Sequence, residues 1–272
     1  MFRYDFMVHA FEAGTIVAIV AGIIGYFAVL RRSSFATHAL SHVGFAGAAG
    51  AVLVGLPPIV GLLAFTVIGG MAIAALGRKA TERDVQIGVV LAFTLGLGVL
   101  FISLYKGYAT EAYSLLFGEI LGISMNDVWV TLIAGIALLF SVIIFYRRLL
   151  FTSLDEEVAE AKGVSTFWME MVFMVLIAVA TSIAVQVVGV LLIFALMVTP
   201  AAIGLQIAKT PLQGMIIALL VALFSVWISL FISFYLSYPV SFFITSLTFA
   251  TYIIVRLVQA KNLQLVPSEE HD

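Results

Sequence analysis

Nine stretches of the chain are mainly apolar and about as long as a helix that crosses a membrane. Such a helix requires about 20 predominantly apolar residues. The seven regular stretches are Gly14–Leu30, Pro58–Leu76, Val85–Tyr105, Val128–Tyr146, Met169–Val185, Pro211–Tyr235 and Val240–Val255. Two further stretches, Phe35–Val54 and Val187–Ile207, contain polar groups and are compatible with broken or shortened helices. The sequence therefore predicts an all-α polytopic membrane protein with eight or nine transmembrane helices.

The composition excludes a water-soluble fold. Of the 272 residues, 63% are hydrophobic and 10% are charged, whereas soluble domains carry about a quarter charged residues. The net charge of −2 provides no basic surface for nucleic acid. The chain has no cysteine, which excludes disulfides and thiolate metal sites.

Basic residues indicate which side of the membrane each loop faces, because Lys and Arg accumulate in short cytoplasmic loops. Nine crossings place the N-terminus outside and leave only Arg3 and Lys106 of the 13 basic residues on that side. The cytoplasmic set is Arg31, Arg32, Arg78, Lys79, Arg83, Arg147, Arg148, Lys162, Lys209, Arg256 and Lys261. A count of eight crossings would require one stretch to re-enter the membrane rather than cross it.

No hydrophilic stretch is long enough to fold on its own. We therefore predict a single transmembrane domain over residues 1–262. Residues 263–272 contain a proline and several acidic residues and are predicted to form a disordered cytoplasmic tail.

Two histidines, His38 and His42, lie within the second stretch, although ionisable side chains are costly in lipid. Residues four apart share one face of a helix, so both imidazoles can reach one divalent ion at about 2.0–2.1 Å. Alternatively, they hydrogen-bond to neighbouring helices and hold the bundle together. A zinc hydrolase would need a carboxylate between them, but Ala39 and Leu40 occupy those positions. The pair is therefore a candidate metal site without hydrolase chemistry.

The cytoplasmic segment 153–163 has the pattern of a short amphipathic helix. Ser153 and Glu156 match an S-x-x-E capping box, and Glu157 adds a second negative charge to the first turn. Gly163 is placed to end the helix. The apolar stripe consists of Leu154, Val158 and Ala161. This stripe is expected to dock in a groove of a soluble partner, and the alternative is that it lies on the lipid surface.

Three residues of the later stretches are candidates for a transport path or a kink. Pro200 is predicted to kink or end its helix. Gln186 and Thr199 could satisfy the loosened backbone or line a path.

Five segments in this order resemble the membrane permease subunits of ABC importers for divalent metals, the ABC-3 family that serves zinc, manganese and iron. The segments are His38-Ala-Leu-Ser-His42, Arg83-Asp-Val-Gln-Ile-Gly-Val89, Leu116-Phe-Gly-Glu-Ile-Leu121, Thr152-Ser-Leu-Asp-Glu-Glu-Val-Ala-Glu-Ala-Lys-Gly163, and Val188-Gly-Val-Leu-Leu192 with Thr199-Pro-Ala-Ala202. The family pattern in the second helix is D-A-x-S-H followed by Leu-Pro-Gly, with the aspartate and histidine as metal-gating groups. His42 matches this histidine, whereas His38 replaces the aspartate and Gly44-Phe45-Ala46 replaces Leu-Pro-Gly.

The resemblance implies the permease subunit of an ATP-driven importer that moves divalent metal ions into the cytoplasm by alternating access. It further implies a location in the bacterial cell (inner) membrane, and a homodimer or a pair with a similar permease subunit. The other implied partners are cytoplasmic ABC ATPase subunits, which contact 153–163 as a coupling helix, and an extracellular or periplasmic metal-binding protein. The chain has no G-x-x-x-x-G-K-S/T phosphate loop, so ATP hydrolysis is expected in a separate subunit.

The transported ion, rather than a permanently bound cofactor, is expected to occupy the histidine pair at the extracellular mouth. A neutral imidazole at position 38 removes one negative charge and favours zinc over manganese. Two alternatives stay open. A secondary carrier driven by an ion gradient would be expected to carry carboxylates at the midplane. An intramembrane metal-dependent enzyme would need a base near the pair, for which Glu12 and Glu119 are the candidates.

Overall fold

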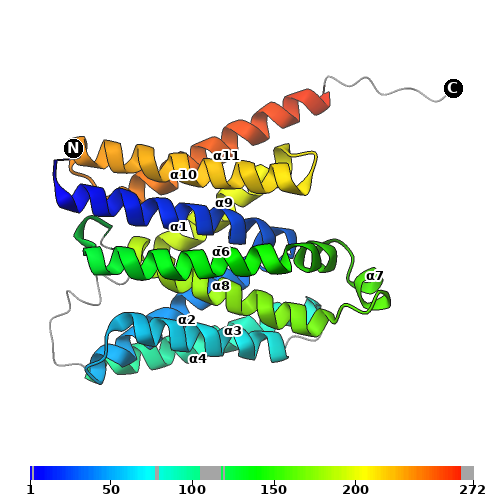
Figure 1. The fold of residues 1–272 in the computed structure, drawn as a ribbon, viewed down its shortest axis with the longest axis horizontal. Coiled ribbons are helices and arrows are strands. Elements are labelled where there is room, and N and C mark those ends of the chain that lie inside the picture. Colours follow the sequence, from blue (N-terminus) through cyan, green and yellow to red (C-terminus); the bar gives the residue numbers. More distant parts are fainter. Residues whose placement is uncertain (2, 77–79, 105–117, 119, 265–272) are drawn as a thin grey trace.

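The protein forms a bundle of long helices aligned with one axis (Figure 1). The computed structural model describes residues 1, 3–76, 80–104, 118 and 120–264. Within these ranges the long helices are α1 (Asp5–Leu30), α2 (Ser34–Leu53), α3 (Pro58–Leu76), α4 (Ala80–Leu104), α6 (Met125–Leu154), α8 (Thr166–Val188), α9 (Val190–Ile207), α10 (Pro211–Leu236) and α11 (Val240–Gln264). Two short elements, the 3-10 helix η1 (Ile120–Gly122) and helix α7 (Glu156–Ala161), lie between them in the chain. The predicted all-α fold is confirmed.

Eight of these helices are long and apolar enough to cross a membrane. The ninth long helix of the described ranges, α2, is unbroken over 20 residues, and most of its side chains are buried. At 1.5 Å per residue it is about 30 Å long, which matches the hydrocarbon core of a bilayer. Its small and polar residues are accommodated because α2 packs against α3, α4, α8 and α9 rather than mainly against lipid. The stretch 35–54 is therefore neither broken nor shortened.

The break in the other irregular stretch, 187–207, falls at Gly189 and not at Pro200. Gly189 has a φ of 87° and separates α8 from α9. Pro200 lies inside α9, which continues to Ile207. A proline removes one backbone hydrogen bond but leaves the rest of the helix ladder in place. Of the two predicted effects of Pro200, a kink or an end of the helix, the second is therefore excluded.

Several helices extend beyond their apolar stretches, because backbone hydrogen bonding continues after the chain leaves lipid. Helix α1 begins at Asp5 and not at Gly14, and α6 runs to Leu154, well past Tyr146. Helix α11 reaches Gln264, so it includes the first two residues of the predicted tail. Residues 265–272, which make up the rest of that tail, lie outside the described residues.

Basic residues gather at one end of the bundle, as predicted. The start of α1 lies at one end, and α7 and the end of α11 lie at the other (Figure 1). The α7 end carries Arg31 and Arg32 after α1 and Arg147 and Arg148 near the end of α6. We refer to it as the cytoplasmic end. Arg78, Lys79 and Lys106, which also entered the prediction, lie outside the described residues.

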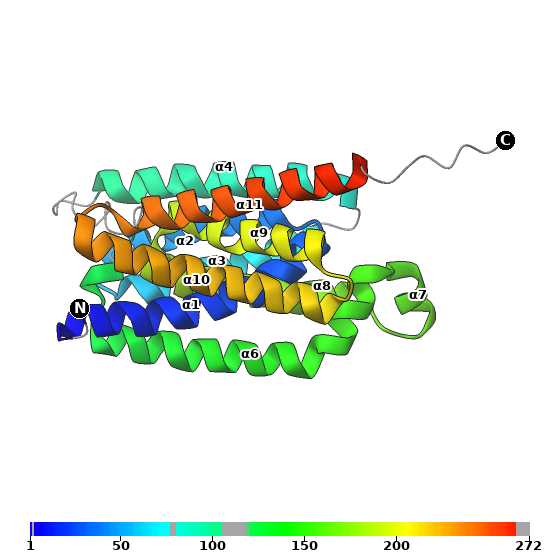
Figure 2. The same cartoon turned by 90° about the horizontal axis from the view of Figure 1, so that it is seen from above.

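Helices α1 and α8 form the centre of the bundle, and α4 and α11 form its least buried part. Figure 2 shows α4 and α11 on the same side of the molecule, away from α6. Their outward side chains are mostly apolar, including Val89 and Phe93 of α4 and Ile254 and Leu257 of α11. Such surfaces suit contact with lipid acyl chains or with another apolar helix.

Candidate metal site and coupling segment

His38 and His42 lie on one face of α2, as their spacing predicts. Their ring centroids are 4.8 Å apart, and the rings are nearly perpendicular. Phe35 stacks on His38 at 6.3 Å, and Phe194 of α9 meets His38 edge-on at 5.4 Å. Both imidazoles are half-buried, so they are held by aromatic neighbours and are still partly open. The structure thus brings together the two groups proposed as metal ligands.

The backbone of α2 is fixed by a close approach to α3. The carbonyl groups of Gly47 and Gly61 leave no room for a side chain at either position. Thr66 of α3 and Ser182 of α8 are also joined by a buried hydrogen bond of 2.6 Å. The hydroxyl of Ser41 donates to the carbonyl oxygen of His38 at 2.7 Å, so it is already engaged within the helix. Helices α2 and α3 are therefore closely packed at these glycines.

The pair lies in the cytoplasmic half of α2 and not at the extracellular mouth. Because α1 ends at the cytoplasmic end, α2 begins there with Ser34. At 1.5 Å per residue, His38 is about 6 Å and His42 about 12 Å along a helix of about 30 Å. Both histidines are therefore nearer to the cytoplasmic start of α2 than to its outer end.

Two imidazoles alone do not complete a metal site. Within the described part of the chain, no group of three or more His, Cys, Asp or Glu side chains is arranged to hold an ion. Glu12 is in the second turn of α1, at the end opposite to the cytoplasmic start of α2. Glu119 lies outside the described residues. A hydrolytic site that uses Glu12 with the histidine pair is therefore not formed.

The coupling segment begins later and is shorter than predicted. Helix α6 continues through Leu154, and the hydroxyl of Ser153 donates to the Leu149 carbonyl within it. Helix α7 spans only Glu156–Ala161, and its cap is Asp155, whose side chain accepts from the Val158 N–H at 2.9 Å. In this described segment Ser153 and Glu156 do not form a capping box, because Ser153 still belongs to α6.

The predicted apolar stripe of this segment is exposed. Leu154 is 62% and Val158 42% exposed, and Ala161 also faces outward. Ala159 is the residue of α7 that is buried against the bundle. Glu157 is exposed, and Gly163 follows α7 in the left-handed conformation with a φ of 79°. The segment therefore presents an apolar edge and negative charges beyond the end of the bundle.

Gln186 lies at the outer end of α8, and Thr199 and Pro200 lie in α9 beyond Phe194, the α9 residue that contacts His38. Gln186 donates from Nε2 to Asp127 Oδ1 at 2.8 Å, which ties the outer end of α8 to the start of α6. Asp127 also forms the capping box of α6 with Ser124. Thr199 is half-buried and Pro200 buried within α9. Gln186 therefore has a structural partner, and its role in a path is not supported.

One ion pair was missed by the sequence analysis. Arg31, just after α1, forms a buried salt bridge of 2.6 Å with Glu170 in the first turns of α8. It also donates to the hydroxyl groups of Thr152 at 2.8 Å and Ser153 at 3.3 Å, at the end of α6. The sequence signal that could have indicated this pair is Glu170, an acidic residue at the start of the apolar stretch Met169–Val185.

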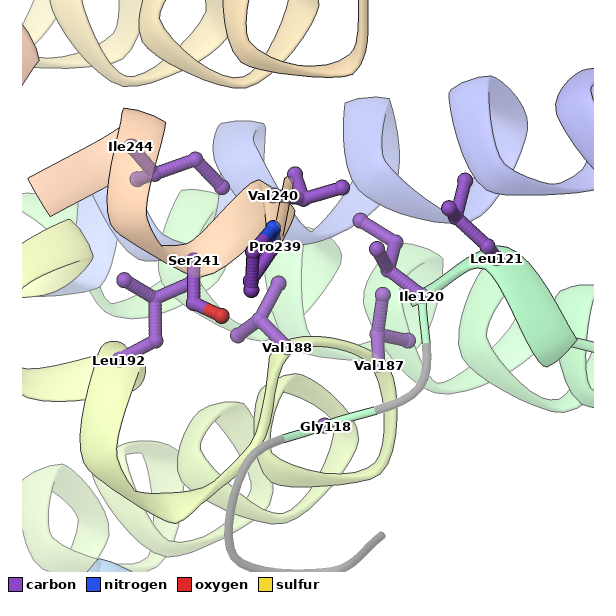
Figure 3. Close-up of a pocket in the computed structure, with 10 residues that line it drawn as sticks. All are labelled: Gly118, Ile120, Leu121, Val187, Val188, Leu192, Pro239, Val240, Ser241 and Ile244. Atoms are coloured by element: carbon purple, nitrogen blue, oxygen red, sulfur yellow. The ribbon is translucent and has the colours of Figure 1, made fainter. Parts of the chain in front are cut away.

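A pocket of about 300 Å³ lies at the outer end between η1, the junction of α8 and α9, and the start of α11 (Figure 3). Of the ten described residues that line it, Ser241 supplies the only polar side chain. Gly118 has a φ of 73° and packs so closely on the backbone of Val188 that a Cβ atom would overlap it. This apolar pocket offers no ligand set for a metal ion, so the histidine pair remains the candidate site.

Comparison with known proteins identifies the family and the fold of the chain. The Listeria innocua protein MntC, a manganese transport system membrane protein, is 33% identical over 203 residues, covering 74% of this chain and 72% of MntC. The manganese import system permease protein ScaB of Streptococcus gordonii is 32% identical over 215 residues, covering 79% of this chain and 77% of ScaB. The solved structure of PsaBC from Streptococcus pneumoniae in complex with Fab superposes with a TM-score of 0.84 at 28% identity, over 95% of this chain and 96% of the matched chain. The ABC 3 transport family matches residues 3–259. The chain is therefore a multi-pass protein of the bacterial inner membrane that belongs to the ABC 3 transport family.

Proposed function

We propose that the chain is the permease subunit of an ATP-driven importer for a divalent metal ion. The observation that carries this proposal is the placement of His38 and His42, two imidazoles 4.8 Å apart on a largely buried helix inside a membrane bundle. Neutral imidazole is a common metal ligand, and ionisable groups inside a membrane usually mark a transport path. Family membership and the names of the similar manganese systems support the same function.

The cargo that the relatives favour is manganese. The sequence analysis favoured zinc because His38 replaces an aspartate, and this preference is not supported by the similar proteins, which are manganese systems. Oxygen ligands suit manganese better than imidazoles do. We therefore infer that the two histidines bind manganese weakly, which suits a site that must release its ion, and that zinc competes for the same site.

A second subunit would complete the ligand set. Two copies of α2 facing a shared axis would supply four imidazoles, so we infer a homodimer or a pair with a similar permease subunit. His38 and Phe194 are partly exposed, and the outward side chains of α4 and α11 are apolar. These surfaces are compatible with a subunit interface and with surrounding lipid.

The energy for transport would come from separate cytoplasmic ATPase subunits. The exposed edge of α7 at the cytoplasmic end is placed to contact them, and its length of six residues makes it dependent on a partner for stability. An extracellular or periplasmic metal-binding protein would deliver the ion at the opposite end. No permanently bound cofactor is needed, and no nucleic acid takes part.

The proposal is tested by measuring radioactive manganese uptake in cells with and without the chain, with excess zinc added in a second series. We expect cells without the chain to accumulate several-fold less manganese, and zinc to reduce uptake only in cells that have the chain. Equal manganese uptake in both strains would contradict the proposal. In a parallel series with radioactive zinc, a difference between the two strains in zinc uptake but not in manganese uptake would contradict the choice of manganese.

A further inference from the structure

Arg31 connects three helices at the cytoplasmic end. Its side chain is 3% exposed, and that of its partner Glu170 is 6% exposed. One terminal nitrogen donates to Glu170 of α8, and the other donates to the hydroxyls of Thr152 and Ser153 of α6. The guanidinium also lies over the ring of Phe173 at 4.8 Å. The planar fork of arginine can make these contacts simultaneously, which a lysine ammonium cannot.

Helix α7 is attached to both helices that hold Arg31. Its cap, Asp155, follows α6 directly and donates its N–H to the Phe151 carbonyl at 3.2 Å. On the other side, the hydroxyl of Thr166 in α8 donates to Glu160 of α7. A displacement of α7 therefore acts on the end of α6 and on the start of α8 together.

Arg31 is also joined to the helix that carries the histidine pair. The turn between α1 and α2 is short, and Arg32 adopts a φ of 56° within it. The N–H of Ser33 donates to the Ala28 carbonyl at 2.7 Å, and α2 begins at the next residue. His38 is about one helical turn further on. A shift of Arg31 is thus passed to His38 through only a few residues of rigid backbone.

A cavity of about 620 Å³ borders this turn. Its walls come from the α1–α2 turn, the start of α4, the end of α6, Glu156 at the start of α7, and α8. The turn is therefore not packed against protein on this side. The turn is held by the contacts of Arg31 and by the hydrogen bond from Ser33 to Ala28, and the open volume leaves room for it to move.

From these contacts we propose that Arg31 is a positioning residue that transmits movement of α7 to the metal-binding helix α2, with Glu170, Thr152 and Ser153 as its anchors. This inference rests on the proposed function, because it requires ATP-driven metal transport. Loss of the network would leave the chain folded and bound to its ATPase, but ATP hydrolysis would no longer move the histidine pair efficiently.

The test compares manganese transported per ATP hydrolysed by the purified permease–ATPase complex in liposomes. The variants are Arg31→Lys, which keeps the charge but loses the fork, and the double variant Thr152→Val with Ser153→Ala, which frees α6 but keeps the salt bridge. The matched control is Arg32→Lys, at the exposed neighbouring residue. Mutations within coupling networks change coupling by about 0.5–2 kcal/mol, so we expect the ratio to fall about two- to thirtyfold in both variants and to stay at the wild-type value in the control.

Copurification with the ATPase and basal ATP hydrolysis serve as structural readouts and should match those of the wild type. An unchanged transport ratio in both variants would overturn the inference alone, provided that the wild type transports manganese. A loss of uptake in proportion to the loss of assembled complex would also overturn it, because the network would then stabilise the complex without transmitting movement. A wild-type complex without ATP-driven uptake would instead overturn the proposed function itself.

Discussion

Gly47 of α2 and Gly61 of α3 approach each other so closely that neither position can hold a side chain. A Cβ atom at Gly47 would overlap the Gly61 carbonyl and lie 2.6 Å from Cβ of Phe65. Carbon atoms pack at about 3.5–4.0 Å, so Gly47→Ala must separate the helices by about 1 Å. Overpacking costs about 1–3 kcal/mol, and alanine regains about 1 kcal/mol of helix propensity. Because the obstacle is backbone, we take the upper value and expect a net loss of about 2 kcal/mol in the free energy of unfolding.

The assay is unfolding of the purified chain in mixed micelles, followed by circular dichroism as the SDS fraction rises. Gly96→Ala of α4 is the matched control, because nothing lies within 4 Å of its Cβ position, and it should be stabilised by up to about 1 kcal/mol. Gly61→Ala should resemble Gly47→Ala, and the double variant should lose less than the sum, because one separation accommodates both methyl groups. A Gly47→Ala protein as stable as the wild type would refute the reasoning.

Three further predictions concern the two ends of the bundle. Val158→Glu places a charge on the exposed edge of α7 and should abolish copurification of the ATPase or its stimulation by metal; normal values of both would exclude docking there. Asp155→Ala removes the cap of α7 at a cost of about 1 kcal/mol, so the α7 amides should exchange hydrogen faster, and unchanged rates would contradict the assigned cap. Gln186→Leu removes the hydrogen bond to Asp127 and should cost about 1 kcal/mol in the SDS titration, with manganese uptake retained; lost uptake at normal stability would restore Gln186 as a path residue.

The transmembrane helices could be predicted because an apolar run of sufficient length has few stable solutions in lipid. Helix α2 was the exception. Its glycines, alanines and hydroxyl groups lowered its hydropathy, and only the contacts with α3 show that these residues serve helix packing. The boundary between α8 and α9 was predicted at residue 186 and lies at Gly189, and Pro200 does not end α9.

The contacts that join distant segments could not be predicted from one sequence. Arg31 and Glu170 are 139 residues apart, and each resembles an ordinary charged residue at the end of an apolar stretch. The cap of α7 was misplaced because Ser153 and Asp155 are both good capping residues and only the length of α6 decides between them. The spacing of His38 and His42 predicted their shared face, and the cytoplasmic placement of Arg31 and Arg32 already implied that the next helix begins at that end. The expected position of the pair at the extracellular mouth was therefore inconsistent with the predicted sidedness.

His38 and His42 are expected to hold the transported ion on its path. The most direct measurement is ATP-driven uptake of radioactive manganese into liposomes by the purified complex, with the wild type compared with His42→Ala. We predict that the variant assembles with its ATPase and hydrolyses ATP but takes up no manganese above the level without ATP. Manganese uptake at the wild-type rate by an assembled His42→Ala complex would contradict the account.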